Sequence, residues 1–219
     1  MAGVTNICAG PFGGLYDFYI ERPWLAQVIG RAAWGIDVAP LYRSMAAIAE
    51  LPDGATVLDV PCGGGVALRA LRPGQRVRWI AVDLEPKMLA RCERRAREHG
   101  LADGALELVE ADMRALPLPD ACADVCLAYS GLHMVEDARR AVAELVRCLK
   151  PGGALRGATF VAEGSRRQRL LLGHGARTGQ NGPLIAAGEL RRMLADAGIA
   201  DVEIAPERGF AIFRGRRAG

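Results

Sequence analysis

The chain has 219 residues, of which 51% are hydrophobic and 24% are charged. This length can bury one sizeable core but is short for two full domains, so we expect one domain with appendages. The formal net charge of +3 is modest, and the composition therefore indicates no polyanionic partner such as nucleic acid.

The six cysteines lie singly along the chain, with no CxxC pair and no histidines at zinc-binding spacing. We therefore expect free thiols and no metal site. The N-terminus lacks the pattern of a signal peptide, and no segment reaches the roughly 18 uninterrupted apolar residues of a membrane span. These observations predict a cytoplasmic protein without a membrane span.

The first predicted elements follow a glycine-rich opening. Apolar residues recur at helical spacing between about residues 23 and 50, with interruptions at Gly35 and Pro40, which predicts two short helices. We interpret residues 1–50 as an N-terminal helical lid or extension, and residues 51–219 as the main domain.

From residue 56 the sequence alternates between strand and helix patterns. The predicted strands are 56–60, 77–82, 105–110, 124–129 and 154–161, and the helices lie at about 65–71, 86–99 and 136–149. Lys150-Pro151-Gly152-Gly153 ends the last of these helices. Such alternation implies parallel strands joined by right-handed crossovers.

A polar, arginine-bearing insertion at 163–184 follows, and we interpret it as a cap on the substrate side. The chain then predicts an amphipathic helix near 187–197 and two strands, 201–205 and 209–213, that form a closing hairpin. The predicted fold is α/β, a Rossmann-like, doubly wound, mostly parallel seven-stranded sheet with a C-terminal antiparallel hairpin and an N-terminal helical lid.

A glycine loop follows the first strand, in the segment Asp59-Val60-Pro61-Cys62-Gly63-Gly64-Gly65. Gly63 and Gly65 can adopt backbone conformations closed to other residues, and the helix expected to start near Val66 would point unpaired N–H groups over the loop. A ligand can therefore lie directly against this backbone.

Three aspartates are predicted at one edge of the sheet. In an open parallel sheet, ligands bind beyond the carboxyl ends of the strands, where Asp59, Asp83 and Asp112 follow successive strands. Like charges there repel one another unless a ligand offers hydrogen-bond donors. Ribose hydroxyls suit Asp83, an amino group suits the neighbourhood of Asp59, and the exocyclic amine of adenine suits Asp112.

These segments resemble motifs of a known family. Four segments carry the resemblance in order over about residues 55–160: Val57 to Gly65, Val82 to Leu89, Ala111-Asp112-Met113, and Leu149 to Gly153. They are similar to class I S-adenosylmethionine-dependent methyltransferases of the small-molecule, methyltransferase-11 or quinone-methyltransferase-like branch. Pro61 stands where many members have a first glycine.

The resemblance implies S-adenosyl-L-methionine as cofactor and S-adenosyl-L-homocysteine as product. It implies in-line methyl transfer to a small, apolar acceptor molecule, with no metal. The implied cofactor-binding residues are Tyr16, Asp59, Cys62, Gly63, Gly65, Asp83, Leu84, Met88, Asp112, Met113 and Ser130. Among them, Asp83 would take the ribose diol, Asp112 with Met113 the adenine, and the Ser130 backbone the amino-acid end, while Tyr16 would cover the cofactor.

His133 is the histidine placed to act as a catalytic base, because it follows the fourth predicted strand. The alternative is a packed histidine near a helix start. Cys62 invites a second pair of interpretations, since a thiol before a helix N-terminus would have a lowered pKa, whereas the family's turn geometry is the simpler account.

Two other functions stay open at this stage. A non-catalytic cofactor-binding protein could keep the fold. A nicotinamide-dependent oxidoreductase shares the sheet and glycine loop, but no tyrosine here has a lysine four residues later. The run Arg166-Arg167-Gln168-Arg169 beside three leucines is compatible with contact with an anionic lipid surface or with a polar group of the substrate, while an ordinary solvated helix face is the default interpretation.

Overall fold

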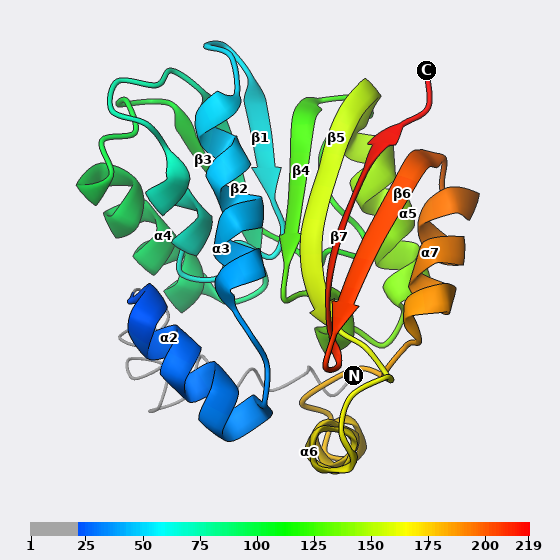
Figure 1. Cartoon of the computed structure of the whole chain (residues 1–219). Coiled ribbons are helices and arrows are strands. Elements are labelled where there is room, and N and C mark those ends of the chain that lie inside the picture. The colour runs from blue at the N-terminus through cyan, green and yellow to red at the C-terminus, as the bar shows by residue number, and fades with distance from the viewer. Residues whose placement is uncertain (1–21) are drawn as a thin grey trace.

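The computed structural model describes residues 22–219, and Tyr16 lies outside the described residues. Its centre is one seven-stranded sheet in the order β3-β2-β1-β4-β5-β7-β6 (Figure 1). The strands are β1 (Thr56–Asp59), β2 (Arg78–Asp83), β3 (Leu106–Glu110), β4 (Ala123–Tyr129), β5 (Leu149–Phe160), β6 (Ile199–Glu207) and β7 (Phe210–Arg217). The first five strands pair in parallel and β7 runs antiparallel to both neighbours, which confirms the predicted fold.

The helices alternate with the strands as predicted. They are α2 (Pro23–Ile29), α3 (Ala39–Ala46), α4 (Pro86–Glu98), α5 (Ala138–Cys148), α6 (Arg166–Arg177) and α7 (Ala187–Asp196). A π-helical turn, Gly30–Trp34, extends α2, and short 3-10 turns span Ala47–Glu50, Val66–Ala70 and Leu132–Met134.

Helices cover both faces of the sheet. One apolar cluster joins α3 and α4 to the sheet, and it contains the fully buried Trp79 of β2. The other joins α5 and α7 to the opposite face, with Leu145 and Leu190 among its buried members. Each fully buried leucine of this kind contributes roughly 1.5–3 kcal/mol relative to an exposed one, so the two clusters hold the sheet rigid between them.

The strand order reverses beside β1. The chain first builds β1, β2 and β3 in one direction and then returns to add β4 on the other side of β1. Ligands in such sheets bind beyond the carboxyl ends of the strands at this reversal. In Figure 1, α2, α6 and the turn between β6 and β7 all lie beyond these strand ends, below the sheet.

Three elements differ from the sequence prediction. A five-residue 3-10 turn replaces the helix expected at 65–71. The insertion contains a regular helix, α6, whose N-terminus carries a capping box in which Ser165 and Gln168 satisfy one another's backbone N–H groups. The closing strands are longer than predicted because β7 pairs with β5 from Phe210 to Arg216.

None of the described helices is long and apolar enough to cross a membrane.

Candidate functional site

The glycine loop is held by hydrogen bonds to both β2 and α4. The Cys62 N–H donates to the Val82 carbonyl at 2.8 Å, and Arg95 of α4 donates to the carbonyl of Gly64. Gly63 and Gly65 both have positive φ, of 50° and 79°. A β-carbon at Gly65 would lie 2.9 Å from Cys92 Sγ, whereas one at Gly63 would meet open space. Gly65 therefore lets the loop pack on α4, and Gly63 presents bare backbone outward.

Asp83 joins the loop to the end of β2. Its Oδ2 accepts a hydrogen bond from the Gly63 N–H at 2.9 Å, and its Oδ1 accepts one from the Glu85 N–H at 3.0 Å. The side chain is only 5% exposed. Burial raises the pKa of the carboxyl, while these two backbone bonds oppose the shift. The sequence-predicted residues Gly63 and Asp83 are thus brought into direct contact.

Asp59 lies beneath the same loop and is 2% exposed. Its Oδ2 is buried and makes no hydrogen bond of ordinary geometry among the described residues, although the nearby Trp79 indole N–H stabilises the carboxylate weakly and opposes the rise of its pKa. Burial, together with the nearby charge of Asp83, raises the pKa of this carboxyl well above its ordinary value. A buried acceptor paired this weakly costs free energy, so the site favours a ligand that brings a cationic or N–H donor.

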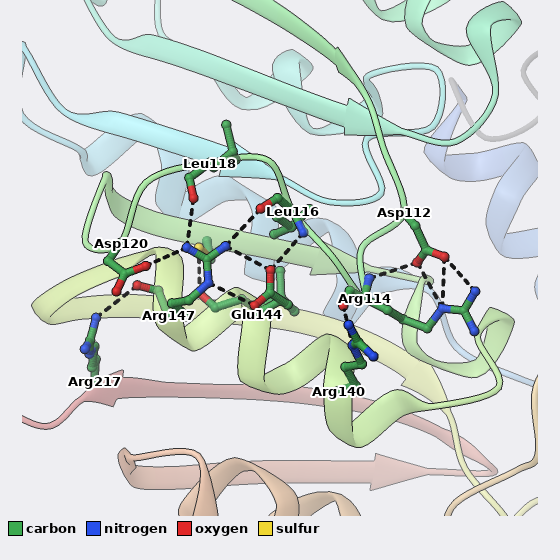
Figure 2. Close-up of polar contacts among 11 residues, drawn as sticks. Asp112, Arg114, Leu116, Leu118, Asp120, Arg140, Glu144, Arg147 and Arg217 are labelled. Carbon is green, nitrogen blue, oxygen red and sulfur yellow. Dashed lines mark hydrogen bonds and ion pairs between the residues drawn. The ribbon is translucent and has the colours of Figure 1, made fainter.

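Asp112 has the opposite environment. Its carboxylate accepts from Arg114 Nε at 3.0 Å on both oxygens and from an Arg114 terminal nitrogen at 2.6 Å, as Figure 2 shows. The Asp112 side chain is about one-third exposed. The hydrogen bonds from Arg114 lower the pKa of Asp112, and the carboxylate stays ionised and fixed in orientation.

Helix α5 holds the segment that follows Asp112. Arg147 donates to the carbonyls of Leu116 and Leu118 at 3.0 and 2.8 Å, and the Leu116 N–H donates to Glu144 Oε2 at 2.8 Å. Arg140 donates to the Arg114 carbonyl at 2.8 Å (Figure 2). The proline-rich linker is therefore tied to α5 at several points, which fixes the loop that carries Asp112.

Sequence reasoning missed Arg95, Arg114, Glu144 and Arg147. Arg114 stands two residues from Asp112, a spacing that is visible in the sequence and could have identified it. The other three act across distances of 28 to 31 residues. Only the fold brings such residues together, so no local pattern could have found them.

The remaining predicted cofactor residues differ in accessibility. Leu84 is 52% exposed at the end of β2, and it offers an apolar surface beside the loop. Met88 and Met113 are buried in the core. Ser130 has a positive φ of 62°, and its N–H donates to the Ala158 carbonyl at 2.7 Å. A left-handed non-glycine residue at a strand end is a conformation that clusters at binding sites.

The environment of Cys62 contradicts a reactive thiol. The side chain is buried, and its Sγ donates to the Gly63 carbonyl at 3.3 Å. A hydrogen bond with Cys92, followed by burial, raises the pKa of Cys62 well above its ordinary value. The hypothesis of a pKa lowered by a helix N-terminus is therefore wrong, because the segment after the loop is a short 3-10 turn and the thiol points into the protein.

His133 is buried at the end of β4. Its Nδ1 is hydrogen-bonded to Thr159 Oγ1 at 3.2 Å, and its ring packs edge-on against Phe160 with 5.0 Å between centroids. Burial lowers the pKa of His133 to about 4, so the imidazole is neutral near neutral pH. Phe160 also contacts Trp34 and Phe210 at 5.3 and 5.1 Å, forming an aromatic cluster at this edge of the sheet.

Gln168 links the segments above this aromatic cluster. Its Nε2 donates to the Trp34 carbonyl at 2.5 Å and to the Arg208 carbonyl at 2.7 Å. The N-terminal helices, α6 and the β6–β7 turn therefore meet at one buried amide. Within residues 22–219, no group of three or more His, Cys, Asp or Glu side chains is arranged to hold a metal ion.

Sheet order and site together define the class of protein. A seven-stranded sheet with an antiparallel β7, a glycine loop after β1 and a carboxylate at the end of β2 is the class I methyltransferase arrangement. Residues 58–156 match the family described as "Methyltransferase domain". Residues 58–156 are thus similar, in both sequence and fold, to class I S-adenosylmethionine-dependent methyltransferases.

The chain is similar to curated and solved proteins of this class. It is 38% identical over 146 residues to the malonyl-acyl-carrier-protein O-methyltransferase of Pectobacterium atrosepticum, covering 64% of this chain and 54% of that protein. It spans about half the length of the curated relatives it matches first, 45% in one case and 54% in another.

Two solved structures show the same fold at low identity. Phosphoethanolamine N-methyltransferase 2 of Haemonchus contortus, solved with phosphomonomethylethanolamine and S-adenosylhomocysteine, aligns at a TM-score of 0.68 and 14% identity over 81% of this chain and 53% of that one. The [4+2]-cyclase SpnF aligns at a TM-score of 0.65 and 22% identity, over 100% of this chain and 99% of the SpnF chain.

Proposed function

We propose that the chain transfers the methyl group of S-adenosylmethionine to a small, apolar acceptor by in-line displacement. The observation that carries this proposal is the contact between Asp83 and the N–H of Gly63, beside the buried Asp59 oxygen that makes no ordinary hydrogen bond. Three groups therefore lie close together at the sheet edge: Asp83, which can accept from ribose hydroxyls, the open backbone of Gly63, and Asp59, which can accept from a cationic group.

The residues present fit a molecule that is cationic at one end and carries a nucleoside at the other. Asp59 would accept from the amino group, Asp83 from the ribose, and Asp112 from the exocyclic amine of the base. Leu84 would cover the apolar face of the base, and Gly63 would leave room for the chain between these ends. When bound, S-adenosylmethionine supplies an already activated sulfonium methyl group.

The acceptor side has the composition of an apolar pocket wall. Trp34, Phe160 and Phe210 form the aromatic cluster, and the N-terminal helices and α6 meet above it through Gln168. We propose that residues 22–50 act as a lid and that the 163–184 insertion caps the acceptor. Excluding water and fixing the acceptor in line would supply most of the rate, on the order of 7–11 kcal/mol when the geometry is good.

A dedicated base is a secondary part of the proposal. His133 is neutral and can accept a proton, but a pKa of about 4 makes it a weak base near neutral pH. Its Nδ1 is already bonded to Thr159. We therefore assign His133 mainly to shaping the acceptor side.

The likeness to SpnF is the reason to test a second candidate, a protein that keeps the fold and performs other chemistry or none. SpnF is named as a cyclase, and it aligns over its whole length. Fold similarity at this identity does not select between methyl transfer and another use of the same site.

Two measurements test the proposal. Calorimetry should show binding of S-adenosylmethionine and S-adenosylhomocysteine and none of a nicotinamide cofactor. S-adenosylhomocysteine release should then be followed with a panel of quinones, phenols, amines and a malonyl thioester, the last chosen because of the Pectobacterium relative. Absence of binding would contradict the assignment, whereas binding without turnover on any acceptor would favour the second candidate.

A further inference from the structure

Helices α2 and α6 expose large apolar side chains. Within residues 22–219, six such side chains are more than one-third exposed: Trp24, Val28, Leu84, Leu108, Leu170 and Leu171. Four of these six belong to the two helices. Trp24 is 67% exposed and Leu170 is 69% exposed, the two highest values of the set. Water contacts this surface at a cost that an ordinary solvated helix face avoids.

On α2 the exposed residues lie on one stripe. Trp24, Val28 and Arg31 are spaced four and seven residues apart, so they share one face of the helix. The opposite side buries Ala26 and Gly30 against the protein. The outward stripe therefore combines an aromatic ring, an aliphatic side chain and a guanidinium group.

On α6 the orientation is set by a buried polar residue. Gln168 is 3% exposed and is bonded to the Trp34 and Arg208 carbonyls, and it faces inward with Leu172 and Gly175. Leu170 therefore points outward, flanked by Arg166 and Arg177 at four and seven residues. The hydrogen bonds of Gln168 override the preference of a leucine for the interior.

The charge on this surface is mainly positive, and the Asp37 carboxylate, 3.8 Å from the Arg31 guanidinium, balances one of its arginines. No acidic residue occurs in residues 22–34 or 166–182, and the arginines there are Arg22, Arg31, Arg166, Arg167, Arg169 and Arg177. Both helices lie beyond the carboxyl ends of the strands in Figure 1, and Gln168 joins α6 to the end of the segment that extends α2. The two basic, apolar helix faces therefore occur at the sheet edge beyond which ligands of such folds bind.

We propose that these helix faces, the α2–α6 surface, dock the protein on an anionic lipid bilayer. Tryptophan and leucine side chains enter the boundary between headgroups and acyl chains, and arginines are attracted to anionic headgroups. A protein partner would match an apolar centre with a rim of mixed charge, whereas here the charged residues that flank the exposed apolar side chains are arginines, Arg22 and Arg31 around α2 and Arg166, Arg167, Arg169 and Arg177 in α6. Charge complementarity selects an anionic surface over a neutral one.

Vesicle co-sedimentation tests the docking without cofactor or acceptor. The full chain is mixed with phosphatidylcholine vesicles, with or without phosphatidylglycerol. We expect binding only when phosphatidylglycerol is present, and a loss of binding as NaCl rises from about 0.1 to about 0.5 M. The triple variant Arg166→Gln/Arg167→Gln/Leu170→Ser should bind at least about tenfold more weakly.

A matched triple variant provides the control. Arg94→Gln/Arg97→Gln/Leu108→Ser removes the same charges and one exposed leucine from α4 and β3, and it should bind as the unchanged protein does. Circular dichroism and thermal melting confirm that both variants are folded. Tryptophan fluorescence gives a second readout, because Trp79 is fully buried and only a weakly covered ring such as Trp24 can shift to shorter wavelength on vesicles. Trp24→Phe should abolish that shift.

Three outcomes would overturn the proposal. Equal binding to neutral and anionic vesicles would contradict the role of the arginines. Unchanged binding by the α6 triple variant would contradict the surface. A dimer in light scattering that the α6 triple variant dissociates, without lipid binding, would show that a second copy of the chain covers these helices. Because these measurements use no cofactor, they are independent of whether methyl transfer occurs.

Discussion

The two ends of the candidate cofactor site hold their carboxylates in opposite ways. At the glycine loop, Asp59 and Asp83 are buried, and burial raises the pKa of each. After β3, Asp112 is partly exposed, and hydrogen bonds from Arg114 lower its pKa. The ionised form of aspartate is therefore disfavoured at the glycine loop and favoured at Asp112, although all three residues lie at the same edge of the sheet.

This difference indicates which end depends on a ligand. Asp112 already has an internal cation, so its charge is balanced before anything binds. The buried oxygen of Asp59 makes no ordinary hydrogen bond, so a cationic ligand would supply the interaction that the protein lacks. We infer that ligand binding changes the charge state of the glycine-loop end and leaves that of the Asp112 end nearly unchanged.

The largest expected effect is at Asp83. Asp83→Asn keeps the shape but replaces one of the two acceptors that hold the Gly63 and Glu85 N–H groups. We expect S-adenosylhomocysteine to bind more weakly by about 1.5–3 kcal/mol, or roughly 10- to 150-fold. Calorimetry measures this loss directly.

Asp53→Asn is the control for that variant. Asp53 is a partly exposed aspartate that pairs with Arg72 and Arg76. It precedes β1 and so lies near the amino ends of the strands, away from the carboxyl ends. Its substitution should leave the dissociation constant unchanged. An equal loss in both variants would mean that global stability, and not the contact with Gly63, sets the affinity.

Asp59 tests the buried end through stability. The pKa of Asp59 is higher in the folded protein than in the unfolded chain. The carboxyl therefore contributes most to the free energy of unfolding at pH values below its pKa in the unfolded chain, and this contribution is lost as the pH rises through its pKa in the folded protein. Asp59→Asn stays neutral at all pH values. We expect its free energy of unfolding to exceed that of the unchanged protein by about 1–3 kcal/mol at about pH 8, with the difference vanishing at about pH 4.

Urea unfolding at several pH values measures that difference, and calorimetry should show weaker cofactor binding by the same variant. A variant that is less stable at every pH would indicate that Asp59 is paired in the folded protein. The contrast between the two ends of the candidate site would then no longer hold.

The predictable part of the site is the part that the chain encodes locally. The glycine loop and Asp83 lie at strand ends that the apolar runs 56–60 and 77–82 already define, so their contact follows from parallel pairing of adjacent strands. The sheet, its closing hairpin and the N-terminal helices could be predicted for the same reason. The protonation of these residues could not, because burial depends on what packs around them.

The unpredictable part depends on contacts between distant segments. Arg147 reaches the carbonyl of Leu116 across 31 residues, and Gln168 reaches Trp34 across 134. Neither residue has a sequence signature, since each bonds to backbone carbonyls that every residue possesses. The reversed pKa shift of Cys62 has the same origin, because Cys92 comes from α4.

Arg114→Met tests the Asp112 end of the candidate site and should weaken cofactor binding less than Asp83→Asn does. Removing the guanidinium lets the Asp112 carboxylate rotate and raises its pKa toward the ordinary value. We expect about a tenfold loss in affinity for S-adenosylhomocysteine. S-inosylhomocysteine, which has a carbonyl where adenine has its amine, should bind almost as well to the variant as before, so base discrimination should narrow.

Two further variants sharpen that result. Arg114→Lys keeps one cationic donor and should restore part of the discrimination. Arg139→Met removes an exposed ion pair with Asp196 between α5 and α7, and it should change neither affinity. If Arg114→Met binds both ligands as the unchanged protein does, the internal cation does not prepare Asp112 for the base.

The smallest expected effect is at His133, which packs against Thr159 and Phe160 and not against the three aspartates. With a pKa of about 4, the ring is already neutral above about pH 5, so its titration should leave the pH profile of turnover flat from about pH 6 to 8. His133→Ala should lower kcat by less than about tenfold, through loosened packing against Phe160, whereas a general base contributes about 10²–10⁴. Thr159→Val removes the same hydrogen bond and keeps the imidazole. A packing defect would lower kcat in both variants alike. If kcat instead falls by 10²-fold or more in His133→Ala and is unchanged in Thr159→Val, the imidazole acts as a general base and the mechanism includes a proton transfer.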